Sequence, residues 1–252
     1  MDPQLSALQS SVERLRSLVE PLSDAQLEQQ AYPTEWRIAD VLSHLGSGAV
    51  ITERRLDDAF AGNAMPDDFA PAVWDTWNAK SPRQKADDGL AADRALLDRL
   101  VSVTDAEQSL FAIAIGPLSF GFSDFVGLRV NEHGLHTWDI EVALDPAATL
   151  HREQVALIID KLGLIARFTG KPTGTVRTID IRTTDPARDF VVDLATDSVT
   201  LVAGTAGAAR VLELPAEAFA RLVYGRLDAE HTGVFTGNAD DVDELRKVFP
   251  GP

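Results

Sequence analysis

The chain has 252 residues, 45% of them hydrophobic and 25% charged, which is the balance of a globular protein able to bury one large core or two moderate ones. Its formal net charge of -16 disfavours nucleic acid as a partner, because an acidic surface repels phosphate backbones. The sequence contains no cysteine, which excludes disulfides, thiolate zinc sites and a cysteine nucleophile. No apolar run reaches the roughly 18 residues of a membrane span and no apolar signal core follows the N-terminus, so we expect a cytoplasmic protein that does not bind membranes.

The first half of the chain shows the three- and four-residue apolar spacing of amphipathic helices. Thr34 is the expected N-cap of the second of them. A connection rich in Asp, Pro and Ala, 62–82, interrupts the pattern, and we expect a short helix within it around Trp74 and Trp77. Helices of this length favour a four-helix bundle; they are expected over about 5–18, 35–60, 83–102 and 123–144.

Asp145-Pro146 is typical of a domain boundary, and the periodicity changes beyond it. We expect an N-terminal helical bundle over 1–147 and a C-terminal α+β domain over 148–252, hence an α plus α/β two-domain fold. Short turns between the strands predict a mainly antiparallel sheet. In the second domain, helices are expected at about 152–169, 216–223 and 240–248, and strands at 176–183, 190–194, 199–202, 211–214 and 233–236.

Two imidazoles and a carboxylate are the candidate metal ligands. Glu132 and His136 are four residues apart and therefore share one face of a helix, in a row that Leu128 and Ile140 continue. His44 lies at the edge of the apolar face of the second helix. Burying such groups without partners is costly, and one divalent ion would satisfy all three. Zinc takes these donors at about 2.0–2.2 Å and often leaves one position open.

The residues themselves leave alternatives open. A lone buried histidine is more often a hydrogen-bonded core residue, and a Glu and a His four apart on a helix often form a surface salt bridge. His133 competes as a ligand; we place it on the outer side because Arg129 and Thr137 lie one turn away, although spacing alone leaves the choice nearly even. Asp40 and Asp139 are candidate hydrogen-bond partners of the ligands.

Two motifs resemble those of a known family. PTEWRIADVLSHL is similar to a signature of DinB-like bundles, and RVNEHGLHTWDIEVAL resembles the R-x-x-E-x-x-x-H-x-W-D signature of the mycothiol-dependent maleylpyruvate isomerase family. The resemblance implies that His44, Glu132 and His136 bind the metal and that His133 does not. The C-terminal half is similar to the family's sterol-carrier-like domain through LPAEAFARLVYGRLDAEHTGVFTGNADDVDELRKVFPGP. Asn238, where an aspartate is common, departs from that pattern.

The resemblance also implies the chemistry. The metal would be Zn²⁺ or another divalent ion, and mycothiol, a low-molecular-weight thiol, would be the external nucleophile and co-substrate. The expected reaction is isomerisation of a small electrophile or transfer of the thiol to it, and neither the substrate nor the oligomeric state follows from the sequence. The absence of cysteine fits this chemistry, because the protein cannot occupy its own metal with a thiolate.

Other residues receive a functional and a structural interpretation. Arg226 is the candidate catalytic cation for an acidic substrate or a developing enolate; the alternative is a surface arginine near a helix end. For Arg129 we favour a salt bridge with an acid. Trp36 and Trp138 are interpreted as core residues.

Two further functions compete with a thiol-dependent enzyme. In a zinc-dependent hydrolase the metal would activate water, with Asp40 or Asp139 as the general base. In a non-catalytic binding protein the C-terminal domain would hold an apolar ligand. The requirement for an external thiol separates the first alternative from the thiol-dependent enzyme.

Overall fold

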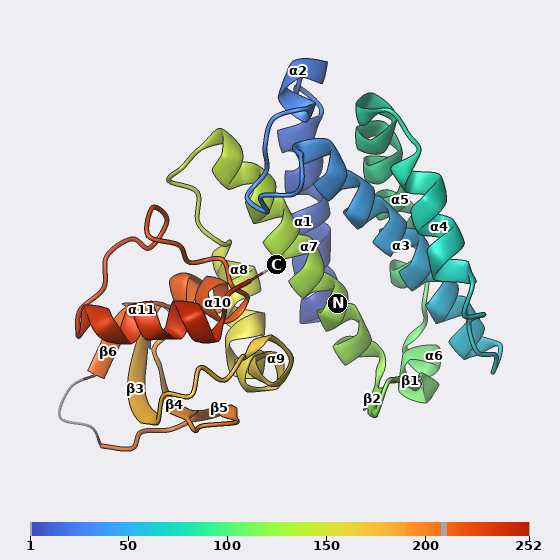
Figure 1. Cartoon of the computed structure of the whole chain (residues 1–252). Coiled ribbons are helices and arrows are strands. Elements are labelled where there is room, and N and C mark those ends of the chain that lie inside the picture. The colour runs from blue at the N-terminus through green and yellow to red at the C-terminus, as the bar shows by residue number, and fades with distance from the viewer. Residues whose placement is uncertain (1, 208–210, 252) are drawn as a thin grey trace. The chain divides into compact units, whose positions relative to one another are not determined.

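The computed structural model describes residues 2–207 and 211–251 (Figure 1). Contacts between Cα atoms divide the chain into two compact units, Met1–Asp145 and Pro146–Pro252. The first unit is helical and the second combines helices with a sheet, which confirms the predicted fold class. None of the helices in the described part of the chain is long and apolar enough to cross a bilayer.

A bundle of four long helices forms the first unit. Within it, α1 and α3 each pack against both α5 and α7, so the four helices enclose a common core. A β-hairpin around Gly116 and a short helix before it, α6, were not expected from the sequence. The bounds are α1 (Pro3–Val19), α2 (Asp24–Leu27), α3 (Ile38–Phe60), α4 (Phe69–Asn78), α5 (Pro82–Val101), α6 (Asp105–Leu110), β1 (Ile113–Ile115), β2 (Leu118–Phe120) and α7 (Phe122–Leu144).

The start of α3 differs from the sequence-based expectation, and Thr34 is not its N-cap. The helix begins at Ile38, because residues 31–37 form a loop stabilised by the Gln30 amide, whose Nε2 donates to the carbonyl oxygens of Pro33 and Trp36 at 2.9 and 2.6 Å. The first turn is instead closed by the Asp40 carboxylate, which accepts from a backbone N–H in this loop. The loop therefore places its side chains against the start of α3.

Small residues allow α3 to approach its neighbours closely. A Cβ atom on Gly46 would lie 2.3 Å from the Trp77 ring and 2.9 Å from the Cα of Gly89. The short helix expected around Trp74 and Trp77 is present as α4, and Trp77 is buried, with 5% of its surface exposed. The connection between the two long helices thus contributes to the core of the bundle.

The second unit is built on a four-stranded sheet in the order β5-β4-β3-β6. Antiparallel pairs join β3 to β4 and β4 to β5, as expected, but β6 runs parallel to β3. The expected strand at 233–236 forms only an isolated bridge between Thr236 and Glu213. The bounds are α8 (Arg152–Ile158), η1 (Ile159–Lys161), α9 (Leu162–Thr169), β3 (Arg177–Thr184), β4 (Arg188–Leu194), β5 (Val199–Ala203), β6 (Val211–Pro215), α10 (Ala216–Val223) and α11 (Ala239–Val248).

Candidate metal centre

The three predicted ligands come together at one point between α3 and α7. One donor atom from each of His44, Glu132 and His136 can be chosen so that all three lie within 4.8 Å of one another. Glu132 Oε2 is 3.3 Å from His44 Nε2 and 3.7 Å from His136 Nε2. Two donors that each bind one ion at about 2.0–2.2 Å lie no more than about 4.4 Å apart. The two separations from Glu132 lie within this limit, and the 4.8 Å bound on the whole set exceeds it by about 0.4 Å, so a shared divalent ion needs only a small movement of the side chains.

The imidazole of His136 is oriented by a buried carboxylate. Its Nδ1 lies 2.8 Å from Oδ2 of Asp139, whose surface is completely buried. A carboxylate can only accept, so Nδ1 carries the proton and donates it, and Nε2 is the ring nitrogen directed toward Glu132. This is the arrangement in which metal-binding histidines are usually held, and it confirms Asp139 as a hydrogen-bond partner of a candidate ligand.

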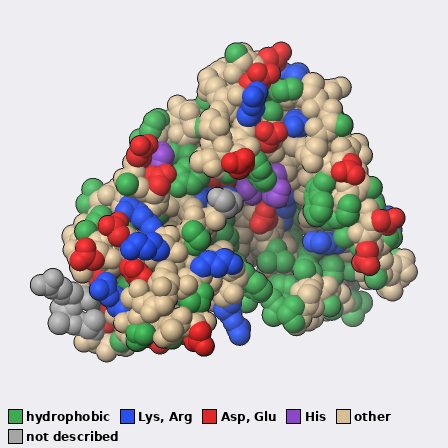
Figure 2. All heavy atoms as spheres, in the orientation of Figure 1, with side chains coloured by type: hydrophobic (Ala, Val, Ile, Leu, Met, Phe, Trp, Pro, Cys, Tyr) green, Lys and Arg blue, Asp and Glu red, His purple; other side chains and the backbone are tan. Residues whose placement is uncertain are grey.

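Glu132 supplies the negative charge of the site. Although the side chain is partly exposed, desolvation by the surrounding protein would by itself raise its pKa, but the hydrogen bond with His44 and the charges of His136 and His44 outweigh that effect and lower the pKa of Glu132 to about 2. The group is therefore an ionised acceptor near neutral pH. Histidine side chains reach the molecular surface (Figure 2), and the exposed fractions of the His44 and Glu132 side chains are 38% and 55%, so the site is open to solvent.

An indole ring covers both imidazoles. The centroid of the Trp36 ring lies 5.1 Å from that of His44 and 5.8 Å from that of His136, and the second pair is stacked with 25° between the planes. Trp36 also packs against the apolar cluster of the bundle, so its interpretation as a core residue is only part of its role. Helical periodicity could not reveal the contact, because Trp36 lies in the loop before α3.

His133 is outside the cluster, but for a different physical reason than expected. It is not on the outer side of α7: its surface is completely buried, and its ring lies 2.7 Å from Ser11 Oγ and 3.2 Å from Asp93 Oδ2. Arg129 forms an ion pair with the same Asp93 at 2.5 Å, which confirms its predicted salt bridge with an acid. The polar neighbours of His133 on α7 therefore indicated a buried network and not solvent.

Asp40 does not contact the ligands, contrary to our expectation. One of its oxygens accepts from Lys85 Nζ at 2.8 Å and the other from the backbone N–H of Arg37 at 3.0 Å. These bonds cap α3 and tie it to α5, and they outweigh burial so that the pKa of Asp40 lies below its usual value. A carboxylate held in this way connects two helices and is poorly placed to act as a base.

Arg226 belongs to the second unit, just after α10. It is buried rather than a surface residue, with 6% of its surface exposed. Its Nη1 donates to the carbonyl oxygen of Tyr224 at 3.1 Å, and its own carbonyl oxygen accepts from Arg221 Nη1 at 3.2 Å. The contact with a carbonyl at the helix end agrees with the helix-dipole interpretation, and the catalytic role stays a prediction.

Comparisons with known proteins identify the family and the fold of the chain. The sequence model of the mycothiol maleylpyruvate isomerase N-terminal domain matches residues 8–141, more than half of the chain. Two crystal structures, of the mycothiol-dependent maleylpyruvate isomerase and of a histidine-to-alanine mutant of it, superpose with a TM-score of 0.69 at 11% and 10% identity. Each comparison covers 93% of this chain and 91% of the other, and at such identity it shows a common fold. No curated protein matches the sequence.

Proposed function

This chain belongs to the mycothiol maleylpyruvate isomerase family, and we propose that it is a metal-dependent enzyme that uses mycothiol as an external nucleophile to isomerise a small electrophile. The observation that carries the metal part of the proposal is the convergence of donor atoms from His44, Glu132 and His136 within 4.8 Å. The thiol part rests on the family. Because this chain contains no cysteine, the thiol would have to come from outside the protein.

The donor set fits zinc or another divalent ion. Two neutral imidazoles and one carboxylate leave a divalent ion with a net positive charge and room for a further ligand. When bound, such an ion would lower the pKa of a thiol and so supply the reactive thiolate. The protein's part is to hold the donors: Asp139 fixes the ring of His136, and Trp36 shields one side of both imidazoles.

Isomerisation by a thiolate needs no other reagent. The sulfur adds to one carbon of a cis double bond conjugated to a carbonyl, and the displaced electron pair moves onto the carbonyl oxygen as an enolate. Rotation about the resulting single bond follows, and return of the electron pair expels the thiolate and restores the double bond as trans. A cation near the enolate oxygen would stabilise it, and the assignment of this role to Arg226 stays a prediction from the sequence. If the sulfur stays on the product, the same site acts as an S-transferase.

The hydrolase alternative finds less support in the site. Both carboxylates that were candidate general bases are engaged elsewhere: Asp40 is paired with Lys85, and Asp139 accepts a hydrogen bond from His136. A hydrolase would need one of these acids to take a proton from water at the open position of the metal. The thiol-dependent enzyme depends less on such a base, because a thiol bound to the metal would release its proton to solvent more readily than water does.

Metal analysis of purified protein tests the metal part. Wild type should bind one zinc per chain, whereas His44→Ala, Glu132→Gln and His136→Ala should each weaken binding by at least about 100-fold, because each removes a ligand. Matched controls are Glu141→Gln, which changes another glutamate on α7, and His231→Ala, in a histidine–aspartate pair of the second unit. Wild-type affinity in all three ligand variants would contradict the assignment.

An activity assay with and without mycothiol tests the thiol part of the proposal. Zinc-loaded protein is mixed with maleylpyruvate, the substrate in the name of the family, with mycothiol present or absent, and the cis and trans products are separated by chromatography. Turnover only with mycothiol supports an isomerase, and consumption of free thiol without isomerisation supports an S-transferase. Equal turnover in the absence of thiol would reject a thiol-dependent reaction.

A further inference from the structure

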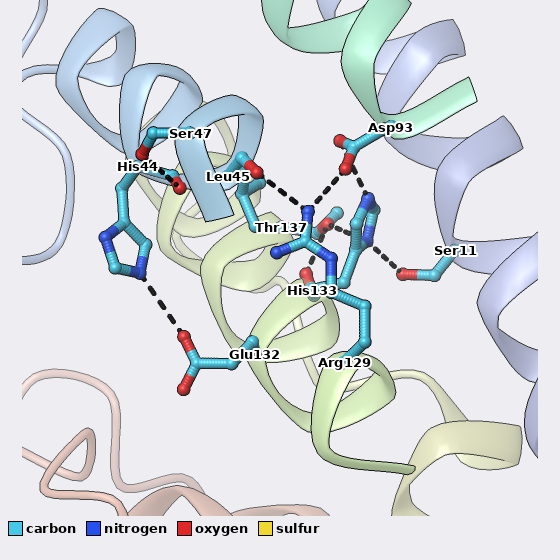
Figure 3. A network of polar contacts seen from close by, with 9 residues as sticks. All are labelled: Ser11, His44, Leu45, Ser47, Asp93, Arg129, Glu132, His133 and Thr137. Atoms are coloured by element: carbon cyan, nitrogen blue, oxygen red, sulfur yellow. Dashed lines mark hydrogen bonds and ion pairs between the residues drawn. The ribbon is translucent and has the colours of Figure 1, made fainter. Parts of the chain in front are cut away.

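A buried ionic network lies on the side of α7 that faces away from Glu132 (Figure 3). Arg129 Nη2 donates to Oδ1 of Asp93 on α5 at 2.5 Å and to the carbonyl oxygen of Leu45 on α3 at 2.8 Å. His133 lies with Nε2 3.2 Å from the other oxygen of Asp93 and with Nδ1 2.7 Å from Ser11 Oγ on α1. The network therefore links α7 to each of the other three helices of the bundle.

Serine, histidine and aspartate in contact are also the residues of a hydrolase triad, but burial excludes that role. The surfaces of Ser11 and His133 are completely buried, and Asp93 is 2% exposed. A nucleophile must come within about 3–3.5 Å of the reacting atom, and no substrate can approach an enclosed hydroxyl in this way. The network must act through the helices that it joins.

The network adjoins the metal ligands on both helices. On α3, the carbonyl that accepts from Arg129 belongs to Leu45, the residue directly after His44. On α7, His133 directly follows Glu132. A metal site needs its donors within about 0.2 Å of ideal distances, so a small slide or rotation of α7 against α3 would take the donors out of range.

Apolar packing is poorly suited to prevent such a movement. Burial of apolar surface is non-directional, whereas hydrogen bonds weaken steeply when their geometry changes. The buried residues of α7 include several polar ones, among them Asn131 and Thr137. A buried ion pair adds little net stability compared with apolar packing, but its geometry can specify one register between helices. Close packing reinforces this: a Cβ on Gly48 of α3 would lie 2.9 Å from Arg129 Nη1.

We propose that Asp93, Arg129 and His133 are positioning residues: their network holds the metal ligands of α7 in register with the ligand of α3 and thereby sets the affinity of the site. This inference rests on the proposed function, because it concerns the same centre. It assigns to buried residues that never touch the metal a measurable effect on metal binding.

Zinc affinity, measured by competition with a chromophoric chelator, tests the proposal in Asp93→Asn and Arg129→Lys. Each variant should bind zinc about 10–100-fold more weakly than wild type, the range seen when groups that orient metal ligands are changed. The control is Leu100→Ala, which removes a fully buried side chain on α5, two helical turns from Asp93, and lowers the stability of the bundle while all residues of the network are kept. Its zinc affinity should remain within about twofold of wild type. A loss in Leu100→Ala as large as in the network variants would overturn the proposal.

The lysine variant separates positioning from a long-range charge effect. Arg129→Lys keeps the positive charge but replaces the rigid planar guanidinium, whose Nη2 donates both bonds, with a shorter and more flexible side chain that does not hold a donor at the same position. A purely electrostatic influence would leave its zinc affinity at the wild-type value, and that result would overturn the proposal. Should Asp93→Asn fail to fold, Arg129→Lys and Leu100→Ala decide the question by themselves.

A metal-free measurement keeps this inference separable from the proposed function. In apo protein, the imidazole NMR signals of His44 and His136 should shift in Arg129→Lys and stay at their wild-type positions in Leu100→Ala. If wild type binds no zinc but these signals shift as expected, the metal assignment fails and the positioning role stands. Unshifted signals in Arg129→Lys would reject the positioning role whatever the metal result.

Discussion

Replacement of Asp139 should weaken metal binding, and the loss should be larger the more completely the replacement removes the hydrogen bond to His136. The carboxylate is completely buried, with Oδ2 2.8 Å from His136 Nδ1. Hydrogen bonds to charged groups contribute about 1.5–3 kcal/mol and neutral ones about 0.5–1.5 kcal/mol. Asp139→Asn keeps an acceptor oxygen but loses the charge, so it should cost about 1 kcal/mol, roughly fivefold in affinity. Asp139→Ala also frees the ring to turn, and the loss should approach about 100-fold.

The assay is zinc competition against a chromophoric chelator at neutral pH, with urea unfolding of each metal-free variant to show that it folds. Asp98→Asn provides the matched control, because that aspartate is exposed on α5 and pairs only with Arg94 among the contacts found for it. It should bind zinc as wild type does. Equal affinities for wild type and Asp139→Ala would refute the reasoning, as would a larger loss for the asparagine variant than for the alanine variant.

Three further predictions concern the indole, the buried acid and the helix contact. Cobalt(II) should quench the fluorescence of Trp36, whose ring centroid is 5.1 Å from that of His44, and Trp36→Phe should abolish most of the quenching on titration. Burial opposes ionisation of Asp93, but the charges of His133 and Arg129 hold its pKa below the usual value. Ionised Asp93 therefore stabilises the fold above about pH 4, the unfolded-state pKa, and this contribution is lost as pH falls through the folded-state pKa. In Asp93→Asn the free energy of unfolding should lack this decrease at acid pH. Gly46→Ala should cost about 1–3 kcal/mol in urea unfolding because its Cβ would overlap a tryptophan ring. Gly121→Ala, with no atom within 4 Å of the added Cβ, should cost less, about 0.5–1 kcal/mol, because Gly121 is the N-cap of α7 and alanine caps a helix less well than glycine.

The helices that carry the site could be predicted because their apolar spacing is regular. The predicted starts of the last two long helices of the bundle each lie one residue after the observed ones, Pro82 and Phe122. The predicted start of α3 was wrong because the Gln30 side chain fixes residues 31–37 as a loop, and side-chain bonds to the nearby backbone leave no periodic signal in the sequence. The parallel pairing of β6 with β3 was not foreseen either, because the direction of a strand depends on the path of the chain between the two strands, and local sequence does not show that path.

The sequence by itself determined the residues of the candidate site, since a four-residue helical spacing and two family motifs single out His44, Glu132 and His136. Only the tertiary structure decided how their surroundings are arranged. In the folded chain His133 is buried against α1 and α5, and Asp40 pairs with Lys85. The indole of Trp36, from the loop before α3, packs against the imidazoles of His44 and His136. The physical reason is that spacing along one helix fixes which side chains share a face. The partner that this face meets depends on contacts between helices far apart in the chain.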